Sequence, residues 1–437
     1  MSNKRRRDAD AENYWSRAHM DRRSLIKTVV VAGGAVVFSG YGTPTRATAQ
    51  DKIRLTQWYH QYGEEGTQQA AQRYAEEYTK VNPNVEVEMV WQPGDYEGAE
   101  LPAALLTDEG PDVYEGHPTV AMVKAGQIEP LDDLFTEEVK QDFHPNNLAV
   151  NTIDGKIYAV KMIDDMGLLY YRKSLLEEKG VTPPTNMDEL IAASKALDTG
   201  RVKGLFLGND GGISALLTIA PWSAGADFLV DNKIVFNDPK TVAAYQKVKE
   251  LNDSGSLLIG SPTDWWDPSA FNQGLSAMQW TGLWAMPGIT EALGDDFGVT
   301  AWPALNAEGA PATFWGGWSE MVNPKSQYVA EAKAFVKWLW IENTAAQQDW
   351  SLSYGFHVPP RISAAAAAEP LKTGPASEAV KFLSDHGKIL PPTWTAAMGT
   401  ALTTALSNIV KNGADPATEV QTAAAACEAE LAQVLGS

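Results

Sequence analysis

Carboxylates are the side chains of this sequence that could most directly carry out a reaction. Asp164 and Asp165 are adjacent, and a second group of acids falls between residues 108 and 115. A glycosidase needs only two carboxylates that flank the bond to be broken. Solvated loops and helix caps are nevertheless the commoner place for acidic residues. The acids therefore leave hydrolysis open but give it no support.

No other catalytic or metal-binding pattern occurs in the sequence. It contains no Gly-rich phosphate loop ending in Lys-Ser/Thr, no G-x-G-x-x-G opening a helix and no G-x-S-x-G. The six histidines never pair at zinc-site spacing, and the single cysteine excludes a disulfide framework or a thiolate cluster. We therefore expect no catalytic residue, no metal and no cofactor. Cys427, in an alanine-rich amphipathic stretch, should be a small buried or half-buried filler.

Aromatic side chains are the second group with a chemical use. The chain has 15 tryptophans, a surplus of planar amphipathic surface. Many aromatics and histidines fall at the ends of predicted strands or in loops rich in Pro and Gly; these are Trp58, Tyr59, His60, Tyr114, His117, Trp222, Trp265, Trp266, Trp315, Trp318 and Trp394. A sugar ring presents C–H faces to aromatic planes and hydroxyls to polar neighbours, so the pattern is typical of carbohydrate recognition. Core packing is the alternative for many of them, and we assign Trp338, Trp340 and Trp350 to packing.

Alternating strand and helix signals must position these side chains. The predicted strands cover 52–58, 85–91, 113–115 and 204–207, and the predicted helices cover 66–81, 96–106, 118–125, 188–197 and 239–254. An Asp154-Gly155 hairpin interrupts the rhythm. A second α/β set occupies about 163–314, and a strand near 316–324 leads into long helices that finish the chain. This order predicts an α/β fold with parallel strands, in which ligands bind at the carboxyl ends of strands.

The segment Gln279–Gly288 places two tryptophans four residues apart around a turn signal. We expect the strand to end at Trp280, the turn to be Thr281-Gly282, and a helix to begin at Leu283. Trp280 should then be a packing or cleft-edge residue. Trp284, in the first turn of the helix, is the candidate for contact with a ligand.

The first 49 residues have the features of an export signal. A basic stretch, Asp21–Lys27, precedes an apolar run at Thr28–Gly40 and an A-x-A site near Ala47. The apolar run of 13 residues is shorter than the roughly 20 that a membrane span needs. The Arg22-Arg23 pair resembles a twin-arginine signal. We expect an exported protein in the periplasm or at the extracellular face of the membrane; a disordered basic tail on a cytosolic protein is the alternative.

Length and charge limit the partners. At 437 residues, two lobes are expected rather than one core. The whole chain has a formal net charge of −20; without residues 1–49, which hold nine Lys/Arg and four Asp/Glu, 26 basic and 51 acidic residues remain, a net charge of −25. Such a surface repels nucleic acid and anionic membranes and favours a neutral or cationic ligand.

Four segments carry a resemblance to a known family. In chain order they are GPDVYEGHPTVAMVKAGQIEPLDDLF, GLLYYRKSLLEEKGVTPPTNMDEL, GLSAMQWTGLWAMPGI and GGWSEMVNP. Their order and spacing resemble family 1 extracellular solute-binding proteins, the maltose-binding-protein-like receptors of carbohydrate ABC importers. The resemblance covers 51–437. Arg172, Asn186-Met187 and Leu283 depart from the family pattern, and they leave the identity of the sugar open.

The resemblance implies a Venus-flytrap fold with a ligand cleft between two α/β lobes. It places lobe 1 at 50–163 and 315–350 and lobe 2 at 164–314 and 351–437, after the export signal at 1–49. The chain would cross between lobes near 162–164, 314–316 and 350. A monomeric receptor would bind a mono- or oligosaccharide and deliver it to the transmembrane subunits of an ABC permease.

Site residues follow from the matching motifs and from loop position. Trp284 takes the stacking position of the family, and Gly316, Gly317 and Trp318 should line the cleft near a crossing. The other expected ligand-binding residues are Trp58, His60, Gln61, Glu115, His117, Asp164, Asp165, Trp222, Trp265, Trp394 and Arg361. A surface ion pair is the alternative for Arg361. A polyamine held by aromatics and carboxylates, or a secreted glycosidase, remains the alternative for the whole protein.

Overall fold

A five-stranded sheet lies at the centre of the first part of the structure, a computed structural model that describes residues 52–93 and 96–436. Its order is β2 (Val85–Gln92), β1 (Ile53–His60), β3 (Val113–Gly116), β14 (Ser319–Val322) and β6 (Val160–Lys161). β1 runs parallel to β2 and β3, whereas β14 is antiparallel to both β3 and β6. The expected parallel sheet is therefore mixed, because β14 returns to it from a distant part of the chain.

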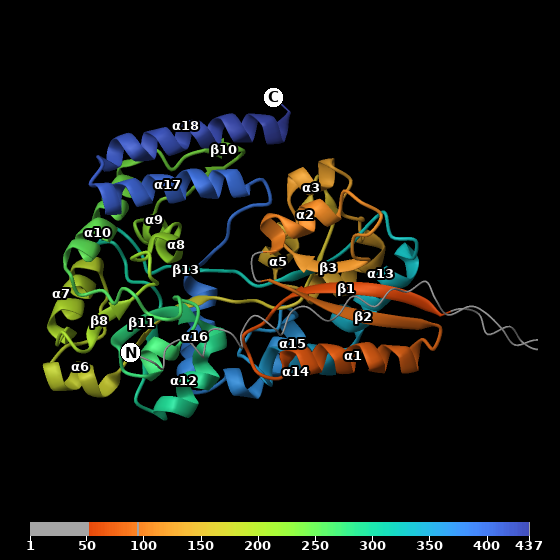
Figure 1. Cartoon of the computed structure of the whole chain (residues 1–437), viewed down its shortest axis with the longest axis horizontal. Helices are drawn as coiled ribbons and strands as arrows, with labels where there is room; N and C mark the ends of the chain where they lie inside the picture. The colour runs from red at the N-terminus through yellow and green to blue at the C-terminus, as the bar shows by residue number, and fades with distance from the viewer. Residues whose placement is uncertain (1–51, 94–95, 437) are drawn as a thin grey trace, which may run out of the picture. The chain divides into compact units, whose positions relative to one another are not determined.

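Helices cover this sheet and bury its apolar faces. α1 (Thr67–Val81) packs on β2 through Ala70, Ala71, Tyr74 and Tyr78, which recur at helical spacing (Figure 1). The remaining elements of this part are η1 (Tyr96–Gly98), α2 (Glu100–Ala104), α3 (Val120–Lys124), η2 (Asp132–Leu134), α4 (Glu137–Gln141), α5 (Pro145–Val150), the hairpin β4 (Thr152–Ile153)–β5 (Lys156–Ile157), α13 (Val329–Lys337), the π-helical η4 (Trp338–Glu342) and α14 (Thr344–Leu352).

A four-stranded sheet organises the second part. Its order is β12 (Gly298–Thr300), β7 (Gly167–Tyr171), β11 (Ser276–Gly282) and β8 (Lys203–Phe206). β7 is antiparallel to both of its neighbours, and β8 is parallel to β11. Every residue of β11 is buried, so this central strand needs apolar or hydrogen-bonded side chains on both faces.

Long helices enclose the second sheet. The other elements of the second part are α6 (Lys173–Lys179), α7 (Met187–Leu197), α8 (Ile213–Leu216), α9 (Ile219–Ser223), β9 (Leu229–Val230), β10 (Lys233–Ile234), α10 (Pro239–Asp253), α11 (Ser269–Asn272), η3 (Leu283–Ala285), α12 (Met286–Leu293), β13 (Thr313–Phe314), η5 (Glu369–Leu371), α16 (Gly374–His386), β15 (Gly387–Lys388), α17 (Ala396–Asn412) and α18 (Pro416–Leu435). α15 (Ile362–Ala367) lies against α14 of the first part. α17 and α18 lie side by side (Figure 1). Between them Cys427 is fully buried, as expected from the sequence, with its Sγ 3.7 Å from the Met398 carbonyl oxygen.

Three segments connect the two sheets and meet one another. They run from β6 to β7, from β13 to β14, and from α14 through α15 to η5. The main chain of Asp164 pairs with that of Val358 through two N–H···O bonds of 2.9 Å, and the Gly316 N–H donates to the Asp165 carbonyl oxygen at 2.8 Å. A short ladder of backbone hydrogen bonds thus ties the three connections together.

Several local predictions differ from the structure. The expected helix at 96–106 is reduced to η1, which ends at Gly98, and the short α2, which contains Pro102 in its first turn. β11 continues through Thr281 and Gly282, where a turn was expected, because both residues keep their pairing with β7.

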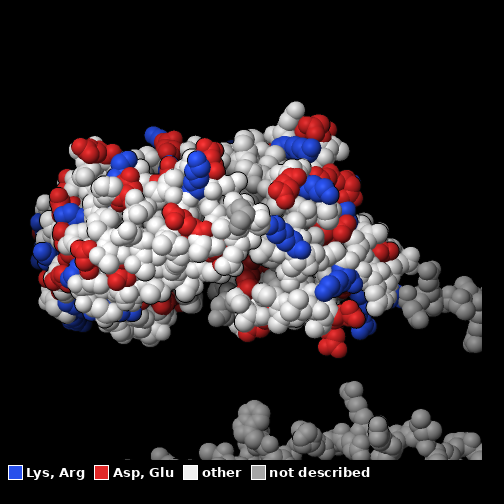
Figure 2. Space-filling model, turned by 90° about the horizontal axis from the view of Figure 1, so that it is seen from above, with Lys and Arg blue, Asp and Glu red and all other residues white. Residues whose placement is uncertain are grey.

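The expected export signal at 1–49 lies outside the described residues. Within residues 52–93 and 96–436, no helix is long and apolar enough to cross a membrane. Figure 2 shows one face of the molecule, on which basic and acidic side chains are interspersed rather than gathered by sign.

Candidate ligand-binding site

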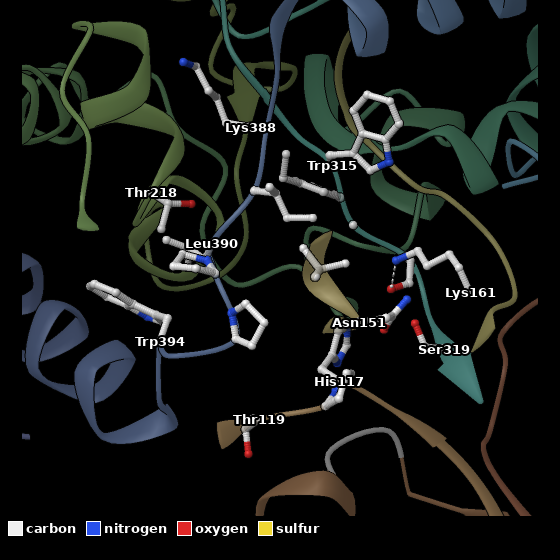
Figure 3. Close-up of a pocket in the computed structure, with 18 of the residues that line it drawn as sticks. His117, Thr119, Asn151, Lys161, Thr218, Trp315, Ser319, Lys388, Leu390 and Trp394 are labelled. Carbon is white, nitrogen blue, oxygen red and sulfur yellow. Dashed lines mark hydrogen bonds between the residues drawn. The ribbon is translucent and has the colours of Figure 1, made fainter. Parts of the chain in front are cut away.

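A pocket of about 300 Å³ opens beside the three connections (Figure 3). Its walls come from the loop after β3, the end of α5, β6, α9, the β13–β14 connection and the segment after β15. The lining residues are His117, Pro118, Thr119, Val150, Asn151, Lys161, Thr218, Trp222, Phe314, Trp315, Gly316, Gly317, Ser319, Lys388, Ile389, Leu390, Pro391, Pro392 and Trp394. Elements of both parts therefore contribute to one cavity of a size that suits a small ligand.

Polar side chains form the wall on the side of the first sheet. Lys161 on β6 and Ser319 on β14 are direct partners in the strand register, and Asn151 follows α5. In Figure 3 these three side chains converge at one end of the pocket. His117, from the loop after β3, completes this wall, and its N–H and Nδ1 contact the Glu97 carboxylate at 2.8 and 3.0 Å.

Lys161 is a buried cation with few partners. Its Nζ donates to the Gly317 carbonyl oxygen at 2.8 Å and lies 3.9 Å from the Asp164 carboxylate. Burial lowers the pKa of Lys161, and the neighbouring Asp164 and Asp165 only partly oppose this effect. Burial likewise raises the pKa of Asp164 to about 6, against the effects of Lys161 and of a hydrogen bond from Asn147.

Aromatic and apolar side chains form the opposite wall. Trp222 on α9 and Trp394 before α17 both contact Phe228 edge-on, at centroid distances of 5.8 and 5.5 Å. Trp222 is 6% exposed and mainly a core residue, whereas Trp394 is only half-buried and presents more of its ring. With Phe314 and Leu390, these rings make one side of the pocket apolar.

Gly317 is required at the connection that forms the back of the pocket. Its φ is +89°, in the left-handed region that favours glycine. A Cβ at this position would stand 2.2 Å from the Ile163 carbonyl oxygen of the adjacent connection. Two connections thus approach each other more closely than any side chain permits, as the expected open backbone at Gly316-Gly317 implies.

The expected acids at the connection are committed to protein partners. Asp165 accepts a hydrogen bond from His357 Nδ1 at 2.6 Å, and His357 Nε2 lies 3.8 Å from Glu64. Burial alone would lower the pKa of His357, but the two carboxylates outweigh burial and raise it. Asp164 and Asp165 are 2% and 5% exposed, and neither lines the pocket.

A second polar and aromatic group lies at the end of β1. Glu115 is fully buried and accepts hydrogen bonds from the His60 backbone and ring and from Tyr62 Oη. Burial lowers the pKa of His60, but Glu115 reverses this and the net pKa is raised. Trp318 lies between His60 and His117, with ring centroids 4.3 and 4.8 Å away. Of this group, only His117 lines the pocket.

Trp284, just after β11, and Trp265, in the loop before α11, form an aromatic pair. Trp284 is half-buried in η3, its ring centroid is 6.1 Å from that of Trp265, and its Nε1 donates to the Trp266 carbonyl oxygen at 3.0 Å. It also lies 6.5 Å from Phe314, a pocket residue. The pair therefore continues the apolar wall outward. Trp280, in contrast, is fully buried against Trp302, as a packing residue.

The structure does not bring the remaining expected residues to the pocket. Arg361 pairs with Asp142 at 2.7 Å, the ion-pair alternative considered for it. Trp58 is half-buried in the core of the first part, and Gln61 is exposed just beyond β1. Within residues 52–93 and 96–436, no group of three or more His, Cys, Asp or Glu side chains is placed to hold a metal ion.

Six polar pocket residues were not expected from the sequence: Thr119, Asn151, Lys161, Thr218, Ser319 and Lys388. Asn151, Lys161 and Ser319 lie together on the side of the first sheet. Lys161 had a detectable signal, because it interrupts the apolar run Tyr158–Ile163 at a buried strand position. Asn151 and Ser319 had none, since small polar residues beside helix ends and strands are common. Their proximity depends on the pairing of β6 with β14, which are far apart in the sequence.

Comparisons with known proteins agree with this architecture. The model of a family described as bacterial extracellular solute-binding protein matches residues 73–379. The chain is 32% identical over 229 residues to a probable ABC transporter-binding protein of Deinococcus radiodurans, across 48% of this chain and 52% of that protein. It is 27% identical over 248 residues to a maltotriose-binding protein of Pyrococcus abyssi, across 55% of this chain and 52% of that protein. The chain thus aligns with about half the length of these two relatives.

A solved structure extends the likeness to nearly the full chain. The GacH receptor of Streptomyces glaucescens, solved without ligand and in complex with acarbose and an acarbose homologue, is 25% identical. The two superpose with a TM-score of 0.72 over 88% of this chain and 99% of the receptor. The expected α/β binding-protein fold and the resemblance to solute-binding proteins are confirmed, and the chain belongs to the bacterial extracellular solute-binding protein family.

Proposed function

We propose that the protein is the extracytoplasmic receptor of an ABC importer and that it binds a mono- or oligosaccharide in the pocket beside the three connections. The observation that carries this proposal is the two-sided lining of the pocket. One wall has aromatic and apolar side chains for the C–H face of a sugar ring, and the other has Asn151, Lys161 and Ser319 for its hydroxyls. The maltotriose-binding relative and the acarbose-binding receptor support the same class of ligand.

The two sheets are the centres of two lobes that close on the ligand. The boundaries expected from the sequence, at 163/164, 314/315 and 350/351, fall in or near the connections described above. A ligand that contacts both lobes favours the closed arrangement by its extra contacts there. The backbone ladder at Asp164, Asp165 and Gly316 is the natural pivot, because it links the connections.

A polyamine is the weaker alternative. A polycation needs carboxylates or aromatic faces around each ammonium group. The described residues that line the pocket include two lysines and a histidine but no Asp or Glu. This charge distribution favours a neutral ligand over a cationic one.

A glycosidase is weaker still, and we infer that no reaction occurs on the ligand. Asp164 and Asp165 are buried, bonded to Asn147 and His357, and absent from the pocket lining. Neither carboxylate has free access to a glycosidic oxygen.

The partners and location follow from the same role. A monomeric receptor, exported by the twin-arginine route to the periplasm or the extracellular membrane face, presents its sugar to the transmembrane subunits of a permease. The interspersed charges and net negative charge argue against nucleic acid as a partner.

A thermal-shift panel tests the proposal. A ligand that binds only the native state raises the melting temperature, by an amount that grows with its concentration over Kd. We expect at least one neutral oligosaccharide, with maltotriose tested first, to raise the melting temperature, and spermidine to leave it unchanged. Stabilisation by spermidine and by no sugar would overturn the proposal. Release of reducing sugar that is lost in Asp164→Asn would instead establish an enzyme.

A further inference from the structure

We infer that Asn151, Lys161 and Ser319 form a site that binds one hydroxyl group of the ligand and discriminates against a carboxylate at that position. The inference rests on the proposed sugar-binding function and adds a selectivity to it. None of the three residues was expected from the sequence. They lie together because β6 pairs with β14 and because α5 ends beside them.

Asn151 supplies an acceptor that lacks a partner. Its Nδ2 donates to the Asn147 carbonyl oxygen at 2.9 Å, which orients the side chain, and its main-chain carbonyl oxygen accepts from the Tyr158 N–H at 2.8 Å. Asn151 is 2% exposed. Its Oδ1 is buried and has no hydrogen-bond partner among the described residues. A buried acceptor of this kind is costly unless a donor reaches it.

Lys161 supplies a donor beside that acceptor. An ammonium group has three N–H bonds, and the Nζ of Lys161 uses one for the Gly317 carbonyl oxygen. The Asp164 carboxylate, at 3.9 Å, is beyond hydrogen-bond distance. Lys161 is 3% exposed, so what remains of its donor capacity can be used only inside the pocket.

Ser319 completes the set with a hydroxyl that can donate or accept. It is 2% exposed and is the strand neighbour of Lys161. Figure 3 shows Asn151, Lys161 and Ser319 gathered at one end of the pocket. Trp394 stands on the opposite side, so a ring that rests against it can direct one substituent toward this end.

The combination of donor and acceptor determines what fits. A sugar hydroxyl donates one hydrogen bond and accepts others, so it can donate to Asn151 Oδ1 while it accepts from Lys161 Nζ. An ionised carboxylate can accept from Lys161 but has no proton for Asn151 Oδ1, and the two oxygens repel. A deoxy carbon satisfies neither group, and sites built to hydrogen-bond a hydroxyl reject such analogues strongly.

Affinity measurements with deoxygenated sugars test the inference. The probe is the neutral oligosaccharide that the wild-type protein binds in the thermal-shift panel, together with its monodeoxy derivatives, and affinities come from calorimetry. One derivative should bind the wild-type protein about 10- to 100-fold more weakly than the parent sugar. In Asn151→Leu that difference should shrink to within about threefold, because the acceptor that recognised the hydroxyl is gone.

Further variants separate recognition from damage to the fold. Ser319→Ala removes only one oxygen atom and should weaken binding of the parent sugar about 3- to 10-fold. Lys381→Met is the matched control, because Lys381 is exposed on α16 and does not line the pocket. It should bind the parent sugar within about twofold of wild type. A variant that merely distorts the pocket lowers affinity for the parent and the deoxy sugars alike.

The outcomes distinguish the two proposals. If the wild-type protein binds no neutral sugar, the proposed function fails and the inference falls with it. If it binds a sugar but Asn151→Leu and Ser319→Ala keep the full deoxy difference, the inference is wrong while the function stands. Another outcome is that the protein binds a uronic acid such as trigalacturonate more tightly than neutral sugars, with this preference lost in Lys161→Met. That result would likewise overturn the inference that the three residues recognise a hydroxyl group.

Discussion

Glu320 gives the protein a stability that should fall as the pH rises. This residue lies on β14 directly opposite Glu115 on β3, and both side chains are fully buried. Gln57 Nε2 donates to Glu320 Oε1 at 3.2 Å. Burial raises the pKa of Glu320 from 4.5 to about 8, and the adjacent Glu115 adds to the rise. The folded state therefore keeps Glu320 neutral at pH values where an unfolded chain ionises it.

The direction and the magnitude of this pH dependence of stability follow from proton linkage. Between pH 4.5 and about 8 the folded state binds more protons than the unfolded state, so the free energy of unfolding decreases as the pH rises through this window. Each pKa unit corresponds to about 1.4 kcal/mol, which makes about 5 kcal/mol the upper limit for the whole window. Between pH 5 and pH 8 we expect a loss of about 3 kcal/mol that is attributable to Glu320.

Urea unfolding of the wild type and of Glu320→Gln at pH 5 and pH 8 measures this loss. Glutamine has nearly the same shape and does not titrate, so the loss of stability between the two pH values should be about 3 kcal/mol smaller in the variant. Any pH-independent cost of the amide cancels in this difference. Glu88→Gln, on the exposed face of β2 in the same sheet, is the control and should retain the wild-type pH dependence. Equal pH dependence in Glu320→Gln and wild type would refute the reasoning.

Three further expectations concern binding and stability. Trp284→Ala should fold normally but bind the sugar at least about tenfold more weakly by calorimetry, because it removes a half-buried aromatic face; unchanged affinity would dismiss Trp284 as a ligand contact. Gly204→Ala should destabilise by about 2 kcal/mol or more in urea unfolding, since its Cβ would stand 1.9 Å from a main-chain oxygen. Gly399→Ala, in the open interior of α17, should instead stabilise by up to about 1 kcal/mol, and equal effects would contradict the packing argument. His357→Gln should lower the free energy of unfolding more at pH 5.5 than at pH 9. Because the pKa of His357 is raised in the folded state, its stabilising contribution is complete below pH 6.5 and is lost as the pH rises through the pKa of the folded state. A cost that does not change with pH would argue against the ion pair of His357 with Asp165.

The elements were predictable from the sequence because their signals are local. The apolar spacing of α1 and the alternation in β2 place each helix or strand without reference to the rest of the chain. The antiparallel placement of β14 was not predictable in this way, because it depends on hydrogen bonds to β3 and β6. The family resemblance supplied that long-range information only in outline.

The expected ligand-binding residues coincide only in part with the pocket lining. The lining includes five of them, which were selected by loop position and motif: His117, Trp222, Trp394, Gly316 and Gly317. Asp164 and Asp165 were selected for their capacity to accept hydrogen bonds from a ligand. In the structure this capacity is used within the protein; Asp165, for example, accepts a hydrogen bond from His357. Whether a polar side chain faces a ligand or another residue depends on its three-dimensional neighbours, which spacing along the chain does not encode.

The packing of α17 against α18 makes the protein its own reporter of unfolding. Cys427 is the single cysteine of the sequence, it is fully buried between these helices, and burial raises the pKa of its thiol to about 12. Thiolate, the reactive form, is therefore scarcer in the native state, and its fraction rises when the helix pair opens and the pKa of the thiol returns toward its ordinary value of 9. The rate of alkylation by a maleimide thus measures how often the C-terminal helices separate, with no engineered label and no second thiol to confuse the signal.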